Sequence, residues 1–233
     1  MKVLYLKRSD IEAEAQKLLV EYGRRFEAVV EPPVPVEEIV DCHLGARLQF
    51  NDLNDGKKTK TVLGALNTET NEVIIDESLD PFEHPEKEGR CRFTLAHETG
   101  HYVLHRPQII VELEQPSLFG DAPSVKLIVC RTLSHKDPME WQADQFAGYL
   151  LLPRDMVLKS WQERRGDVQP YIAAGELSNL SARWRLAENE TPTVAIARDM
   201  ARQFKVSGQA MQIRLVELGL IRLKEDQREM FRD

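Results

Sequence analysis

Cysteine is scarce in this sequence of 233 residues, and its few copies are spaced neither as metal ligands nor as a disulfide framework. Cys42, Cys91 and Cys130 are odd in number and far apart, with no CxxC pair among them. This argues against a small disulfide-bonded secreted domain and against a thiolate zinc site. Unpaired thiols persist in a reducing compartment, so we expect a cytoplasmic protein.

The sequence also lacks an excess of basic residues and any long apolar run. Lys and Arg number 31 against 38 Asp and Glu, which gives a formal net charge of -7. A chain of that sign has no overall field that attracts nucleic acid or an anionic membrane surface. The first apolar run covers only residues 3–6, too short for a signal-peptide core, and no stretch reaches membrane-spanning length. We therefore expect no export, no membrane association and no direct binding to DNA.

The order of sequence patterns predicts an α+β fold with a small, mostly antiparallel sheet. Apolar residues at helical spacing predict helices at 9–26 and 36–44. The short β-rich runs that follow predict strands at 46–50, 61–67 and 72–76. Two further helices, at 90–105 and 138–152, are predicted to end at Pro107 and Pro153, with an irregular connection between them. We expect one domain over residues 1–160 and a packed, all-helical region over residues 161–233.

The segment FTLAHETGHYVLH contains the motif HExxH, formed by His97, Glu98 and His101. Positions four apart differ by only about 40° around a helix, so both imidazoles face one point. Glu98 lies about 60° from His101, which suits a general base better than a third ligand. Zinc accepts imidazole nitrogens and lowers the pKa of bound water to about 7. The predicted cofactor is one zinc ion per chain, with manganese as the alternative ion in the cell.

A hydrolytic zinc site usually has three protein ligands, so a third must come from another segment. The metzincin continuation HExxHxxGxxH is absent, because positions 104 and 107 are Leu104 and Pro107. The later segment MEWQADQFAGYLLLP offers Glu140 and Asp144 on one helix face. We predict that Glu140 binds the metal, while Asp144 accepts the outer N–H of a ligand histidine.

Small residues suggest that the two motif helices approach closely. Gly100 lies inside a helix, where glycine costs about 1 kcal/mol relative to alanine. Ala143 and Ala147 lie on the same side of the later helix as Glu140. A close approach of the two backbones would explain the glycine.

Glu140 also has a structural interpretation. Asp137, Pro138 and Glu140 fit the N-cap, N1 and N3 positions of a helix start, where the Glu140 side chain would bind backbone N–H groups instead of a metal. Two acidic residues in the irregular connection, Glu112 and Glu114, are then the reserve candidates for the third ligand.

Two residues near the motif are weaker candidates for the cleft. Tyr102 could stabilise an oxyanion, and His105 lies one turn beyond His101. A single histidine of this kind is more often packed or hydrogen-bonded than functional. The strand at 61–67 or 72–76 could also hold a substrate by edge pairing, which would orient a flexible target segment.

Near the C-terminus, residues 200–221 have the pattern of two helices around a tight turn, with Ser207 as the predicted N-cap. A DNA-reading helix is one interpretation. Over residues 182–233, however, ten Lys and Arg face eight Asp and Glu, a surplus too small for strong phosphate binding. Packing of these helices against the domain of residues 1–160 is the favoured interpretation.

Three ordered segments, RFTLAHETGHYVLH, EWQADQFAGYLLLP and FKVSGQAMQIRLVELGLI, resemble the ImmA/IrrE family of metallopeptidases. The resemblance implies a zincin-like, gluzincin-type core with His97, His101 and Glu140 as zinc ligands and Glu98 as base. It also implies a substrate class, since members are associated with cleavage of helix-turn-helix repressors of mobile elements or of stress and DNA-damage responses. The alternatives are a DNA-binding regulator or a toxin–antitoxin component in which the zinc site is structural.

Overall fold

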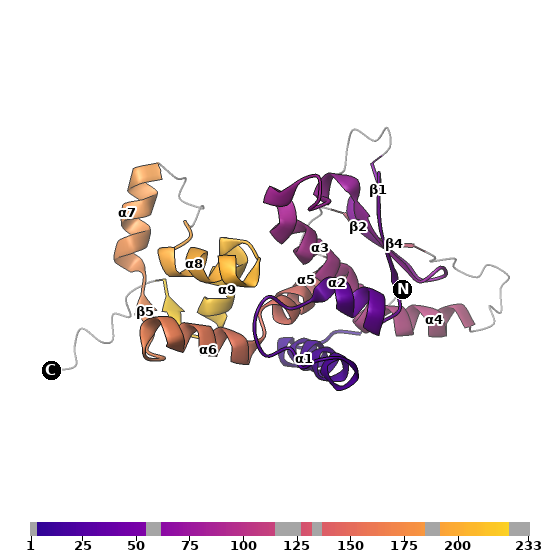
Figure 1. Ribbon diagram of the computed structural model, residues 1–233, viewed down its shortest axis with the longest axis horizontal. Coiled ribbons are helices and arrows are strands. Elements are labelled where there is room, and N and C mark those ends of the chain that lie inside the picture. Colours follow the sequence, from indigo (N-terminus) through magenta and orange to yellow (C-terminus); the bar gives the residue numbers. More distant parts are fainter. Residues whose placement is uncertain (1–3, 55–61, 115–126, 132–136, 185–191, 224–233) are drawn as a thin grey trace. The chain divides into compact units, whose positions relative to one another are not determined.

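The computed structural model describes residues 4–54, 62–114, 127–131, 137–184 and 192–223 (Figure 1). For residues 111–114, 127–131 and 182–184 it describes the backbone alone. The chain divides into two compact units, Met1–Leu151 and Leu152–Asp233. The first unit combines a sheet with helices and the second is mainly helical, which confirms the predicted α+β class. The functional division proposed at residue 160 stays a prediction.

Among the described residues, the first unit contains a four-stranded sheet in the order β1-β3-β2-β4. Strand β1 runs parallel to β3, whereas β2 is antiparallel to both β3 and β4. This confirms the prediction of a small, mostly antiparallel sheet. Strands β2 and β3 have a neighbour on each side, so β1 and β4 are the edges. The strands are β1 (Arg47–Asn51), β2 (Val62–Asn67), β3 (Glu72–Asp76) and β4 (Leu127–Arg131).

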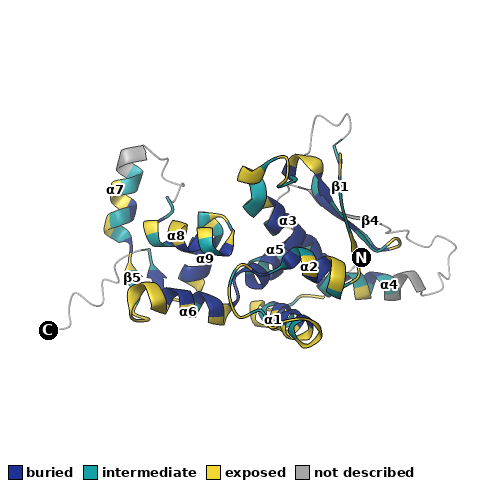
Figure 2. Ribbon diagram, in the orientation of Figure 1, coloured by how far each residue is buried: buried dark blue, intermediate teal, exposed yellow. Residues whose placement is uncertain are grey.

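Helices α3 (Glu88–Gly100) and α5 (Pro138–Leu151) form the buried centre of the first unit. Figure 2 shows them buried along much of their length, whereas α1 (Arg8–Arg25) is buried on one face and exposed on the other. This one-sided burial follows from apolar residues at helical spacing on α1. The remaining elements before α3 are α2 (Val36–Glu38), η1 (Ile39–His43), η2 (Glu77–Leu79) and η3 (Pro85–Lys87).

The segment after α3 is more regular than predicted. The helix does not end at Pro107, because it continues through η4 (His101–His105) into α4 (Arg106–Glu114). In the π-helical turn η4, the Arg106 N–H bonds to the carbonyl of His101, five residues earlier. Pro107 follows directly after this wider turn, at a position where proline would interrupt a regular α-helix. Strand β4 also lies where an irregular connection was expected, and its apolar LIVCR sequence pairs with β2.

The second unit is built from α6 (Arg154–Arg165), α7 (Ala174–Trp184), α8 (Ala195–Phe204) and α9 (Gly208–Glu217). It is not entirely helical as predicted, because β5 (Tyr171–Ile172) and β6 (Ile221–Arg222) form a short parallel pair. Its core includes large fully buried side chains, among them Trp161 and Phe204. In the described part of the chain, no helix has both the length and the apolar character needed to cross a membrane.

Helices α8 and α9 form the predicted helix-turn-helix. Helix α8 ends at Lys205, which adopts the left-handed conformation with φ 53°. The Ser207 hydroxyl oxygen accepts a hydrogen bond from the Ala210 N–H at 3.1 Å and caps α9, as predicted. Arg214 of α9 is buried, and its Nε donates to the carbonyl of Leu152. These contacts hold α9 within the second unit.

Candidate metal centre

Helices α3 and α5 lie in close contact because small residues face each other. A Cβ atom on Gly100 would lie 3.1 Å from Ala143 Cα and 3.2 Å from the Ala143 carbonyl oxygen. Ala143 and Ala147 are fully buried. This confirms the close approach predicted from these small residues. It brings the first turn of α5 beside the last turn of α3.

We expect Gly100→Ala to destabilise the first unit by up to about 2 kcal/mol, because the added methyl group would lie 3.1 Å from Ala143 Cα and force the α5 backbone to give way. Overpacking costs about 1–3 kcal/mol, of which alanine regains about 1 kcal/mol in helix propensity. The same change should weaken zinc binding, since the predicted ligands lie on both helices. Urea unfolding and a zinc titration measure the two effects. Gly148→Ala on α5 is the matched control, because a Cβ there meets nothing within 4 Å and should be neutral or stabilising. Normal stability and zinc affinity in Gly100→Ala would contradict the prediction.

The structure brings His97, His101 and Glu140 together as one group that could hold a metal ion. His97 Nε2 lies 3.0 Å from His101 Nε2 and 3.2 Å from Glu140 Oε2. His101 Nε2 lies 3.4 Å from Glu140 Oε1. Zinc–ligand bonds of about 2.0–2.1 Å in a tetrahedral site place neighbouring ligand atoms about 3.3 Å apart. The nearest atom pairs are therefore close to this spacing, with Glu140 Oε2 nearer His97 and Oε1 nearer His101, and one ligand atom from each of the three side chains lies within 4.8 Å of the others.

The sequence also allowed Glu140 to cap the start of α5 instead of binding a metal, and the contacts at that helix start can be compared with this alternative. Asp137 caps the helix on its own, since its Oδ1 accepts a hydrogen bond from the Met139 N–H at 2.9 Å. The Glu140 carboxylate instead faces the two histidines. The side chains of the reserve candidates Glu112 and Glu114 lie outside the part that the structure describes.

Asp144 contacts the outer nitrogen of His97. Its Oδ1 is 2.9 Å from His97 Nδ1. A carboxylate can only accept a hydrogen bond, so His97 Nδ1 carries the proton and donates a hydrogen bond to Asp144. The lone pair of His97 Nε2 then faces His101 and Glu140, the other members of the candidate ligand group. The Asp144 side chain is 35% exposed, so its charge keeps contact with water.

His105 lies behind His101 and does not belong to the ligand group. Its Nδ1 is 2.9 Å from His101 Nδ1, and its Nε2 is 3.2 Å from Gln142 Oε1. Burial lowers the pKa of His105 to about 4. Gln142, fully buried on α5, was missed in the sequence, although a polar residue on the apolar face of a helix is a recognisable signal.

Tyr102 is turned toward a different part of the unit. Its hydroxyl donates to the carbonyl of Leu44 at 3.1 Å, and the Arg106 guanidinium lies 4.7 Å from the centre of its ring. The structure therefore gives Tyr102 a contact with the end of η1 and does not place it in the ligand group.

Glu98 is fully buried where α3 faces strand β2. A Cβ atom on Gly64 of β2 would lie 2.6 Å from Glu98 Oε1 and 2.8 Å from Thr94 Cγ2. The missing side chain at Gly64 therefore makes room for the Glu98 carboxylate. The sequence analysis missed Gly64, although glycine inside a strand often marks a close approach.

Burial and close contacts give the ligand group the protonation states that metal binding requires. Burial lowers the pKa of His101, which keeps its imidazole neutral. Burial alone would raise the pKa of Glu140, but contacts with His101 and His97 outweigh that effect and lower it to about 2. Neutral imidazole and ionised carboxylate are the forms that bind metal ions.

Comparison with solved structures finds similarity to a Mycobacterium tuberculosis transcriptional regulator, with a TM-score of 0.44 and 16% sequence identity. The similarity covers 91% of this chain and 56% of that one, so this chain spans little more than half its length. No curated protein matches the sequence.

Comparison with protein families gives a match to Peptidase_M78, the IrrE N-terminal-like domain, over residues 43–216. The matched region covers more than half of the chain and contains the HExxH segment of α3 and η4, helix α5, helix α8 and all of α9 except its last residue. It agrees with the resemblance to the ImmA/IrrE family found in the three sequence segments. On this match the chain belongs to the Peptidase_M78 family of IrrE N-terminal-like domains.

Proposed function

We propose that this chain is a zinc-dependent endopeptidase. The observation that carries the proposal is the convergence of His97, His101 and Glu140 close to the spacing of a tetrahedral site, in a chain of a peptidase family. A zinc ion held by these groups would polarise a peptide carbonyl and lower the pKa of a coordinated water to about 7. Manganese is the alternative ion.

Glu98 is the proposed general base. It follows His97 directly on α3, and its carboxylate is held in the buried space that Gly64 leaves open. In this position the side chain removes a proton from the attacking water and returns it to the leaving amine. General acid–base catalysis of this kind typically contributes about 10²–10⁴-fold to the rate.

The proposed substrate-binding edge is strand β4. The sequence-based hypothesis that a substrate pairs with β2 or β3 was wrong, because both strands already have two neighbours. Strand β4 pairs only with β2 among the described residues, and Cys130 of β4 lies opposite Gly64. Neighbouring strands are about 4.8 Å apart, so β4 lies one strand beyond the glycine that faces Glu98. An extended peptide paired with β4 would lie two strand spacings, about 10 Å, from Gly64.

A helix-turn-helix repressor is the proposed protein substrate, on the resemblance to the ImmA/IrrE family. Its cleavage would release the genes of a mobile element or of a stress or DNA-damage response. A flexible segment of such a repressor could adopt the extended form that strand pairing requires.

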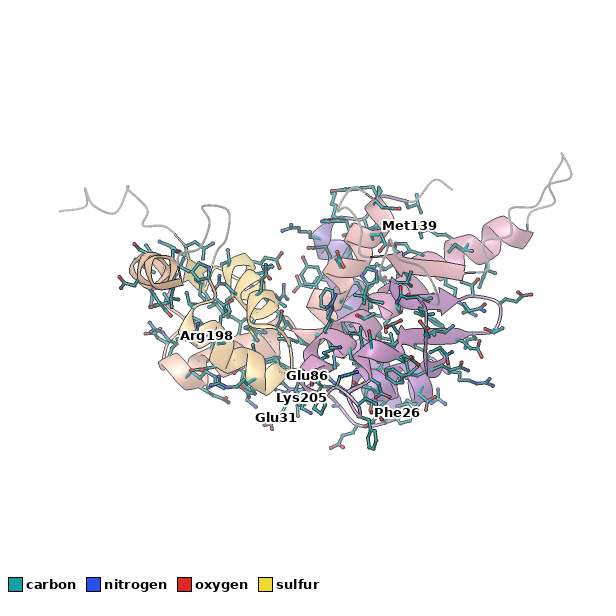
Figure 3. The ribbon with its side chains drawn as sticks, turned by 90° about the horizontal axis from the view of Figure 1, so that it is seen from above. Phe26, Glu31, Glu86, Met139, Arg198 and Lys205 are labelled. Carbon is teal, nitrogen blue, oxygen red and sulfur yellow. The ribbon has the colours of Figure 1, made fainter. Side chains whose placement is uncertain are left out.

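The surface of α9 gives no support to direct DNA reading. Gln209 and Ile213 are exposed on α9, whereas its one cation, Arg214, is buried. The exposed cations Arg198 and Lys205, labelled in Figure 3, belong to α8 and the turn after it. A recognition helix normally directs polar or basic side chains at base edges and phosphates. We infer that α9 does not read DNA.

Incubation of the zinc-loaded chain with purified helix-turn-helix repressors from the same organism should yield two fragments of the substrate repressor, whose masses define the cleaved bond. Removal of zinc by a chelator should abolish cleavage, and stoichiometric zinc should restore it, because the site supplies the Lewis acid. A manganese-loaded sample tests the alternative ion. An intact repressor after incubation with fully loaded protein, together with salt-dependent binding to promoter DNA, would favour a regulator with a structural zinc site.

A further inference from the structure

A line of buried polar groups runs from the metal centre to the N-terminal segment. His101 Nδ1 lies 2.9 Å from His105 Nδ1, and His105 Nε2 lies 3.2 Å from Gln142 Oε1. The side-chain nitrogen of Gln142 donates to the carbonyl of Leu4 at 2.9 Å. His101 and Gln142 are 0% exposed and His105 is 1% exposed, so bulk water does not compete for these contacts.

The donor and acceptor of each hydrogen bond can be assigned by starting from the Leu4 carbonyl, which is the last group in this line. The Leu4 carbonyl only accepts, so Gln142 directs its nitrogen there and its oxygen toward His105. The Gln142 oxygen also only accepts, so His105 carries a proton on Nε2. Both hydrogen-bond partners of this buried ring are neutral groups, and a cation without a paired countercharge would be costly there. Nδ1 of His105 is therefore the acceptor.

His101 must then donate from Nδ1 to His105. A neutral imidazole has one proton, so Nε2 of His101 keeps its lone pair. That lone pair faces the space between His97 and Glu140. The orientation of a backbone carbonyl at the N-terminal segment thus determines which nitrogen of His101 is available to an ion.

We propose that His105 and Gln142 are positioning residues that fix the tautomer and ring orientation of His101 for metal binding. The proposal rests on the metal function proposed above and concerns side chains outside the ligand group. Outer hydrogen-bond partners of this kind typically change metal affinity by about 10–100-fold.

Burial explains why His101 has a neutral partner while His97 has a carboxylate. Asp144 is 35% exposed on its side-chain atoms, so its negative charge remains hydrated. The position behind His101 is almost fully buried, and an additional carboxylate there would lose most of its hydration. An imidazole followed by an amide supplies an acceptor for the Nδ1 proton without placing a charge in the core.

The zinc dissociation constant, measured by competition with a chromophoric chelator, tests this role. His105→Phe removes the acceptor while retaining a planar ring, and should weaken zinc binding about 10–100-fold. His105→Asn is the rescue variant, because its Oδ1 is bonded to Cγ as Nδ1 of histidine is. It should recover an affinity within about threefold of the original. The visible spectrum of the cobalt-loaded chain should change in His105→Phe and recover in His105→Asn.

Three results would overturn the proposal. The first is an unchanged zinc affinity in His105→Phe, and the second is an equal loss of affinity in His105→Phe and His105→Asn. The third is nitrogen NMR evidence that, in the zinc-loaded chain, His105 is protonated on Nδ1. Thermal unfolding of the metal-free variants separates a folding defect from a ligand defect. A wild-type chain that binds no zinc would overturn the proposed peptidase function instead. Normal zinc binding in the wild type and in His105→Phe would overturn only the positioning role.

Gln142→Met provides a second, independent measurement, because methionine is similar in size and lacks the acceptor. It should weaken zinc binding about threefold to tenfold in the original chain and less than twofold in the His105→Phe background, since Gln142 acts through His105. Equal effects in both backgrounds would show that Gln142 does not act through His105 and would overturn its proposed positioning role.

Discussion

Glu98→Gln should retain one zinc ion per chain and lose about 10²–10⁴-fold in the rate of peptide cleavage. Glutamine is nearly the same size and leaves His97 and His101 in place, but it cannot accept a proton from water at neutral pH. Cleavage of a fluorogenic peptide derived from the mapped substrate site measures the rate, and metal analysis measures the zinc. Cleavage at the original rate in the zinc-loaded variant would reject Glu98 as the base.

Gly64→Ala is the matched variant for this prediction, because it leaves Glu98 in the sequence and changes only its surroundings. The new Cβ would lie 2.6 Å from Glu98 Oε1, so the carboxylate has to move. The overlapping atoms are the end of one side chain and a threonine methyl group, so the fold should tolerate the change. We expect retained zinc and slowed cleavage. Normal cleavage would show that the Glu98 position observed here does not matter for catalysis.

Glu140→Ala should lose zinc at concentrations that saturate the original chain, with an affinity more than about a hundredfold weaker, because it removes a ligand and not merely an outer partner. Cleavage should fall to the background. Competition with a chelator measures the affinity over the required range. The expected loss exceeds that of any other substitution outside the histidine pair.

Asp144→Asn is the control for the Glu140 prediction. Asparagine can still accept a hydrogen bond from His97 Nδ1, so only the charge is lost. We expect a zinc affinity lower by about 10–100-fold at most. If Glu140→Ala binds zinc as tightly as the original chain, the third ligand lies elsewhere, and Glu112 and Glu114 become the candidates to replace.

The ligand group could be predicted from sequence because its geometry is largely local. His97 and His101 are one helical turn apart, and Glu140 and Asp144 are related in the same way on α5, so each pair shares a helix face in any protein. The meeting of the two helices was also predictable from Gly100, because an interior glycine is costly unless another backbone approaches it.

The remaining features depend on contacts between distant segments, which periodicity does not encode. Gly64 matters because β2 lies against α3, and Gln142 matters because the carbonyl of Leu4 lies beside it. Strand β4 was missed because its pairing with β2 decides its conformation. The continuation through Pro107 was missed because the π-helical turn before it is a tertiary adjustment.

The candidate ligands His101 and Glu140 lie on separate helical segments of the first unit, 39 positions apart in the sequence, so they come together only in the folded chain. An ion that binds only the folded state adds about 2.7 kcal/mol of stability when its free concentration is a hundred times its dissociation constant. Among the described residues, the members of this candidate group all lie in the first unit. If zinc is the ion, degradation in a zinc-starved cell would therefore begin in the first unit, and the amount of this protein would follow the availability of the ion.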